Sequence, residues 1–166
     1  MTIEDEDLLL EVLNSAPVLD GVPTEELDSP AGSELVERFG GVGTTAERLH
    51  LKRTRDALQG MIRQKNGATE HLARTLRNAV LLPEATSHGL HWQLDAPDNE
   101  RLSARVVLAW SLVMERLPGR LRACANTECN LFLIDHSRPG TAKWCSMATC
   151  GNRIKARAHA RRARGS

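Results

Sequence analysis

The stretch WCSMATCGNRIKARAHARRARG, residues 144–165, determines the fold expected at the C-terminal end of this chain of 166 residues. It holds two cysteines, Cys145 and Cys150, and then a segment in which nearly every other residue is basic. Paired cysteines are typical of metal-binding loops, and arginines repeated along a helix are typical of surfaces that contact phosphates. The stretch therefore predicts a metal-stabilised module that presents a basic helix.

All four cysteines of the chain form two pairs with the spacing C-x4-C, and fifteen residues separate the pairs. Zn²⁺ takes four ligands in a tetrahedron, and a short loop with two cysteines supplies two of them. Four thiolates leave no position for water, so we expect one structural zinc ion. Free buried cysteines and disulfides are the alternatives, which the paired spacing and a reducing compartment disfavour. The expected ligands are Cys124, Cys129, Cys145 and Cys150.

The segments around the cysteines predict a small module of β-hairpin and helix. The apolar run at 131–135 is followed by Ser-Arg-Pro-Gly, which is a strong turn signal. We therefore expect a hairpin with strands near 131–135 and 141–145. Ser146 is a suitable helix cap, and the residues after it are mostly helix formers. A cysteine knuckle, a hairpin and a helix that carries the last ligands make a treble-clef-like arrangement.

Charge divides the chain into two parts. Residues 120–166 hold ten Lys or Arg and two acidic residues, a net charge of +8, whereas residues 1–119 hold twelve basic and nineteen acidic residues, a net charge of −7. Opposite charges favour two modules with a boundary near 119/120, the basic one with a polyanionic partner. The alternatives are that the two parts attract each other or that the basic tail is only solvated.

The tail helix predicts contact with duplex DNA. Arg153, Arg157, Arg161 and Arg164 recur at spacings of four, four and three, so they line one helix face. A guanidinium can contact phosphate oxygens with two donors, and each phosphate neutralised releases counterions. The tail lacks aromatic residues on which single-stranded bases could stack, so duplex DNA is the better partner. The full set of expected contacts is Arg138, Lys143, Arg153, Lys155, Arg157, Arg161, Arg162 and Arg164.

The block CSMATCGNRIK, with RLRAC upstream and LFLIDHSR between, resembles the CGNR zinc finger family, named for the four residues found here at 150–153. The resemblance implies the four cysteines as ligands and the bases after them as a DNA-binding face. In many bacterial proteins this module follows an ABATE domain, which is described as a stress-induced transcription regulator. Residues 1–119 resemble that domain by position and by the fragments LEVLNSAP and DSPAGSELVERFG.

The first 119 residues predict a mostly helical domain with a short strand or hairpin, so the whole chain is expected to be mainly α within the α+β class. Aromatic residues are scarce, so Leu, Val and Ala must build the core. Ser29 and Pro30 predict a helix start, as does Thr44 followed by Glu47 in a capping box. The expected helices are 5–14 (alternatively a buried strand), 30–39, 45–64, 69–81 and 99–117, and the expected strand lies within 87–94.

No pattern in the chain predicts an enzyme. The glycine-rich stretch GGVGTTAER lacks the Lys-Ser/Thr ending of a phosphate-binding loop, and the histidines are scattered. Apolar runs are too short to span a membrane, and the acidic N-terminus is unlike a secretory signal, so a cytoplasmic protein is expected. The function that fits best is transcription regulation, with an unknown small-molecule effector and a homodimer both open. The alternatives are a protein-interaction adaptor and a structured-RNA binder.

Overall fold

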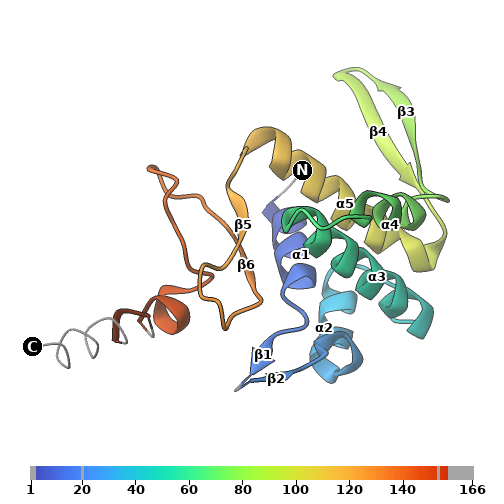
Figure 1. The fold of residues 1–166 in the computed structure, drawn as a ribbon. Helices are drawn as coiled ribbons and strands as arrows, with labels where there is room; N and C mark the ends of the chain where they lie inside the picture. Colours follow the sequence, from blue (N-terminus) through green and yellow to red (C-terminus); the bar gives the residue numbers. More distant parts are fainter. Residues whose placement is uncertain (1–2, 20, 153, 157–166) are drawn as a thin grey trace, which may run out of the picture.

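The computed structural model describes residues 3–19, 21–152 and 154–156, which are drawn as a ribbon in Figure 1. Its helices are α1 (Ile3–Leu13), α2 (Pro30–Arg38), α3 (Thr45–Ile62), α4 (Ala68–Thr75) and α5 (Asp98–Arg116), with short turns η1 (Glu26–Asp28) and η2 (Met147–Gly151). Its strands are β1 (Val18–Leu19), β2 (Val22–Pro23), β3 (Val80–Thr86), β4 (Gly89–Asp95), β5 (Leu121–Ala123) and β6 (Phe132–Ile134). The expected α+β class, with small antiparallel hairpins and a cysteine cluster near the C-terminus, is confirmed. None of the helices described is long and apolar enough to cross a membrane.

Helices α1, α3 and α5 pack against one another around the hydrophobic core. Along α5, Leu102, Val106, Ala109 and Val113 recur three or four positions apart, and all four are buried. Residues 5–13 belong to a helix, not to a strand, because α1 buries Leu8, Leu9, Val12 and Leu13 at helical spacing. The core consists mainly of Leu and Val, as the scarcity of aromatic residues predicted.

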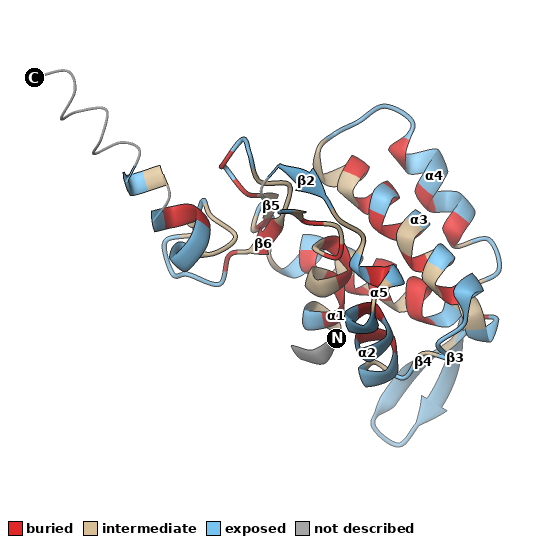
Figure 2. Ribbon diagram, turned by 90° about the horizontal axis from the view of Figure 1, so that it is seen from below, coloured by how far each residue is buried: buried red, intermediate tan, exposed pale blue. Residues whose placement is uncertain are grey.

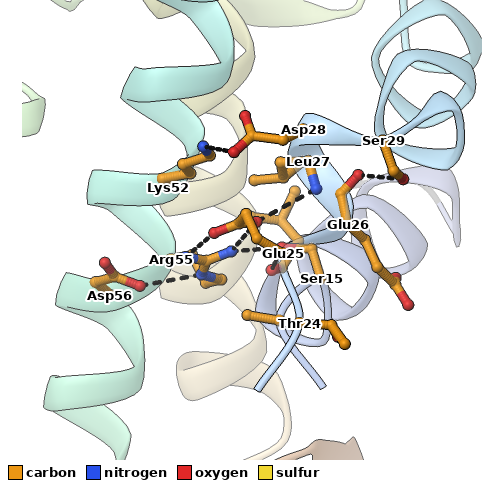
Figure 3. A network of polar contacts seen from close by, with 12 residues as sticks. Ser15, Thr24, Glu25, Glu26, Leu27, Asp28, Ser29, Lys52, Arg55 and Asp56 are labelled. Atoms are coloured by element: carbon orange, nitrogen blue, oxygen red, sulfur yellow. Dashed lines mark hydrogen bonds and ion pairs between the residues drawn. The ribbon is translucent and has the colours of Figure 1, made fainter. Parts of the chain in front are cut away.

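The described residues between α1 and α2 form regular structure. They form the β1–β2 hairpin and η1, and Arg55 of α3 holds them in place (Figure 3). Both terminal nitrogens of Arg55 donate to the Glu25 carboxylate at 2.8 Å, and one of them also donates to Ser15 Oγ at 3.1 Å. Arg55 is only 5% exposed, so these partners compensate the cost of burying its charge.

The two predicted helix starts are in place, but their capping differs. Ser29 occupies the N-cap position of α2, yet its hydroxyl donates to the Glu26 carbonyl and caps nothing in α2. Thr44 caps α3 by accepting from the Glu47 N–H at 3.1 Å, as predicted. In a capping box the Glu47 carboxylate would accept from the Thr44 N–H. Here it accepts from the N–H groups of Val42 and Gly43, both at 2.8 Å. The glycine-rich loop thus wraps a buried side-chain carboxylate of its own chain.

The expected helix 69–81 is too long, because α4 ends at Thr75 and β3 begins at Val80. Strand β3 pairs with β4 in an antiparallel hairpin that projects from the helices (Figure 1). The register places Leu81, Pro83 and Ala85 opposite Leu94, Trp92 and Leu90, so one face of the hairpin is apolar. Trp92, which lies on this face, is 55% exposed. The β-branched and apolar content of 80–86 suits a strand once β4 lies beside it.

The C-terminal segment packs directly on the helical unit. After α5 a turn of a few residues leads into β5, and Leu121 and Phe132 belong to the same core as the helices. Figure 2 colours the buried residues of the helices and of the C-terminal segment red. Asn130 Nδ2 donates to the Ala16 carbonyl at 2.6 Å, and its Oδ1 accepts from the Val18 N–H at 3.1 Å. The boundary at 119/120 stays a prediction, but many contacts cross it.

Candidate metal centre

Strands β5 and β6 flank the first cysteine pair, and their pairing corrects the sequence prediction. The expected hairpin joined 131–135 to 141–145, whereas β6 pairs with β5 in the register Ala123↔Phe132, and 141–145 forms no strand. The reason is the knuckle itself, which reverses the chain between the two cysteines. Its turn is closed by hydrogen bonds from Cys129 N to Asn126 O and from Cys124 N to Leu131 O, both 2.8 Å.

The second cysteine pair lies beside this knuckle. The Ala125 N–H donates to the Lys143 carbonyl at 2.8 Å and so brings Cys145 alongside Cys124. Ser146 caps the following turn, as predicted, because its Oγ accepts from the Thr149 N–H. That turn, η2, is π-helical and contains Cys150.

Gly151 lies close to two side chains of its own segment. A Cβ at this position would lie 2.8 Å from Met147 Sδ and 3.3 Å from Trp144 Cδ1. A larger residue at position 151 would require the flexible Met147 side chain to move and would press against Trp144.

The four sulfur atoms converge on one point. All four Sγ atoms lie within 4.8 Å of one another, and Cys145 Sγ is 3.7 Å from both Cys129 Sγ and Cys150 Sγ. Sulfur ligands about 2.3 Å from a tetrahedral zinc ion are separated by about 3.8 Å. The arrangement therefore fits one zinc ion with four thiolate ligands. Cys124 and Cys150 are buried and the other two cysteines are partly exposed, as in a structural site.

Hydrogen bonds to the sulfur atoms favour the thiolate form. Asn126 is 1% exposed, and its Nδ2 donates to Cys150 Sγ at 3.5 Å, while the Cys145 N–H donates to Cys124 Sγ at 3.4 Å. Burial would raise the pKa of Cys150, but hydrogen bonds from Asn126 and the neighbouring cysteines lower it overall. Burial raises the pKa of Cys129 and Cys145, so these two need the charge of a bound cation to ionise.

Asp135 organises the loop that follows β6. Its buried carboxylate accepts from the Ser137 and Ala142 N–H groups, both at 2.9 Å, and forms an ion pair with Arg122 at 2.8 Å. Hydrogen bonds from the Ser137 side chain and backbone and from Ala142, with the charge of Arg122, lower the pKa of Asp135 to about 2 despite its burial. Sequence reasoning missed both Asp135 and Asn126. Two features of the sequence could have identified them: Asp135 is an acid within a basic segment, and Asn126 is an amide between the first two cysteines.

Residues 120–163 match the model of the CGNR zinc finger family. The match spans all four cysteines, so the sequence comparison and the sulfur geometry agree on one structural zinc ion. The likeness of residues 1–119 to an ABATE domain is not shown by any family match. No curated protein matches the chain. The family match therefore covers the metal-binding part of the chain.

The residues expected to contact DNA are only partly within the described chain. Arg138, Lys143 and Lys155 are exposed. Lys143 directly precedes Trp144 and the second cysteine pair, and Lys155 lies just after η2. Both are therefore close in sequence to the cysteines of the metal site. Five expected contacts lie outside the described residues, namely Arg153, Arg157, Arg161, Arg162 and Arg164.

Proposed function

We propose that the chain is a bacterial transcription regulator whose zinc finger binds duplex DNA. The observation that carries the proposal is a net charge of +8 on residues 120–166 beside −7 on residues 1–119. A segment that gathers one sign of charge on a zinc-stabilised platform attracts a polyanion, and phosphate neutralisation supplies affinity without reading sequence. The helical unit then serves as the sensor of a small-molecule effector.

The zinc site contributes by orienting the basic residues. Cys150 belongs to η2, and Lys155 follows it by five residues, so the metal holds the start of the basic segment in place. The four thiolates close the coordination shell, which supports a binding function instead of catalysis. The helical unit in turn supports the finger, because Arg63, next to the end of α3, donates to the Asn130 carbonyl at 2.8 Å.

Two other functions would use the same basic surface, namely a protein-interaction adaptor and a structured-RNA binder. An adaptor would meet an acidic protein surface, and an RNA binder would recognise the shape of a helix or loop. The absence of aromatic residues after Trp144 in the sequence makes recognition of unpaired bases by stacking the least favoured mode.

The test is the salt dependence of DNA binding by the zinc-loaded protein. Fluorescence anisotropy with random-sequence duplex DNA should show tight binding at low salt and a steep loss as salt rises. Arg157→Ala/Arg161→Ala should make the slope of log K against log salt shallower by about 2, because each phosphate contact contributes roughly 0.9.

A matched control removes two exposed cations from the helical unit. Arg77→Ala/Arg116→Ala carries the same change of charge, and its slope should equal that of the wild type. If the metal-filled protein ignores DNA even at low salt, the proposal is wrong. Binding of a structured RNA, or of an acidic protein, would then favour the corresponding alternative.

A further inference from the structure

A cavity of about 690 Å³ lies between α3 and α4, in the helical unit and away from the zinc finger. Its apolar wall includes three small buried residues, Ala57, Gly60 and Ala68. A Cβ on Gly60 would lie 3.0 Å from the Ala68 Cβ, so the two helices approach closely here and the small side chains leave the cavity open. Its volume is within the range of sites that bind small molecules.

The cavity is lined by cations that have no partner. Arg53 comes from α3, Arg74 from α4 and Lys65 from the turn between them, and all three are exposed. Within the described residues, none of these side chains makes an ion pair or a hydrogen bond. The acidic residue in the lining is Asp56, and it is bonded to Arg55 Nε at 3.0 Å (Figure 3). Three uncompensated positive charges thus face the cavity.

This clustering is unusual for a unit with a net charge of −7. Other basic side chains of the unit have partners, such as Lys52 with Asp28 and Arg105 with Asp5. Of the described residues from 3 to 119, only five Lys or Arg side chains have no polar partner. Three of the five line this cavity, and the other two are Arg77 and Arg116. Like charges brought together repel, and an anion between them would relieve that repulsion.

We propose that the cavity between α3 and α4 binds a small organic phosphate. Guanidinium groups of Arg53 and Arg74 contact phosphate oxygens with two donors each, and Lys65 adds a point charge. His50 and His71 line the same cavity and supply further hydrogen-bond partners. The small apolar residues of the wall accept the organic part of the ligand. A phosphate suits three cations better than a carboxylate, because it carries more charge and more oxygen atoms.

The turn after α3 links this cavity to the zinc finger. Lys65 lines the cavity, while Arg63, two residues earlier, lies 4.3 Å from the centre of the Phe132 ring and bonds to the Asn130 carbonyl. Between them, Gln64 has a φ of 54°, a left-handed conformation that is strained for a side chain other than glycine. A ligand that draws Lys65 inward therefore acts on a strained turn. The same turn carries Arg63, whose hydrogen bond holds Asn130, the neighbour of Cys129.

This inference deepens the proposed function, since it names the site and chemical class of the effector, but its test needs no DNA. Isothermal titration of the zinc-loaded full chain with glucose 6-phosphate and with pyrophosphate should give saturable binding with a Kd below about 1 mM. Glucose and sulfate at equal ionic strength are the ligand controls. Arg53→Gln/Lys65→Gln/Arg74→Gln should weaken binding at least about tenfold, the effect of losing charge-assisted hydrogen bonds.

The matched protein control is Arg77→Gln/Arg116→Gln, which removes the two unpartnered cations outside the cavity and should change the Kd less than about twofold. All five residues are exposed, and circular dichroism checks that each variant is folded. Absence of saturable binding by both phosphates, or an equal loss in both variants, overturns the proposal. DNA affinity of the triple variant is measured in parallel. If the triple variant loses DNA binding and the wild-type protein does not bind the two phosphates, the cavity is a nucleic-acid surface, which also overturns the proposal.

Discussion

Asn14, just after α1, is joined to Phe132 of β6 by two hydrogen bonds. The Phe132 N–H donates to Asn14 Oδ1 at 2.7 Å, and Asn14 Nδ2 donates to the Phe132 carbonyl at 3.2 Å. One side-chain amide thus occupies the position that a neighbouring strand would take beside β6. Asn130 makes the same kind of contact in the other direction, with the backbone of Ala16 and Val18. The zinc finger and the helical unit are therefore joined by specific polar contacts as well as by a shared core.

Asn14→Ala should lower the free energy of unfolding by about 1–3 kcal/mol, because it leaves the N–H of buried Phe132 without a partner. Urea unfolding followed by circular dichroism measures the change. The control is Asn78→Ala, which removes exposed bonds to Glu100 and should cost less than about 0.5 kcal/mol. Equal effects of the two substitutions would show that the Asn14 contact does not stabilise the junction.

Zinc removal should unfold the finger and also weaken the helical unit. The sequence alone predicts that chelation unfolds only the C-terminal module, since a unit of this size cannot hold itself together by its core. The structure extends that expectation, because unfolding of the finger would expose Phe132 and Leu121 together with the helix residues they cover. Hydrogen exchange before and after chelation should show lost protection in β5 and β6 and partial loss in α1. Protection in β5 and β6 that survives complete metal removal would refute it.

Asn126→Ala should lower zinc affinity about 10- to 100-fold, the usual effect of removing a group that hydrogen-bonds to a metal ligand. The physical reason is the Nδ2–H···Sγ bond to Cys150, which stabilises the negative charge on sulfur. Competition with a chromophoric chelator gives the affinity. Asn152→Ala is the control, because Asn152 bonds to the Ala148 carbonyl and to no sulfur, and it should leave the affinity unchanged.

Asp135→Asn should destabilise the zinc finger by the same amount at every pH from 8 to 5. Because the folded-state pKa of Asp135 is lowered to about 2, its stabilising effect is fully present above its ordinary value of 3.8 and is lost only as the pH falls towards 2. Zinc release at mildly acidic pH then reflects protonation of the thiolates. Urea unfolding of both proteins across this range measures the difference. A difference that shrinks between pH 7 and 5 would mean that Asp135 titrates there.

Trp92 should dominate fluorescence quenching by acrylamide. It lies on the apolar face of the β3–β4 hairpin and is 55% exposed, whereas Trp110 and Trp144 are partly buried. Trp92→Phe should remove most of the quenchable emission, and Trp144→Phe should remove little. Protection of Trp92 in the wild-type protein would show that another molecule covers the hairpin face.

Local chemistry explains which predictions were confirmed. The C-x4-C spacing identified the four cysteines that converge, because a short loop brings its two ends together whatever surrounds it. The helix starts at Pro30 and Thr45 depend on residues within one turn, and both are in place. Ser29 occupies the N-cap position of α2, but its hydroxyl is directed to the Glu26 carbonyl at the end of η1.

Pairing between distant segments could not be predicted in this way. Residues 76–81 have good helix formers, yet β4 draws 80–86 into a hairpin. The apolar run 131–135 suits a strand, but its partner is β5, because the cysteine knuckle turns the chain so that β5 lies beside it, whereas 141–145 forms no strand.

The sequence by itself determined the metal, its four ligands, the segregation of charge and the positions of most helices, because each depends on residue types at short spacing. Only the tertiary structure decided that Asn126 bonds to a sulfur, that Asn14 and Asn130 join the two units, and that Arg53, Lys65 and Arg74 face one cavity. These relationships depend on how helices and strands pack, and packing brings together residues that no spacing along the chain relates.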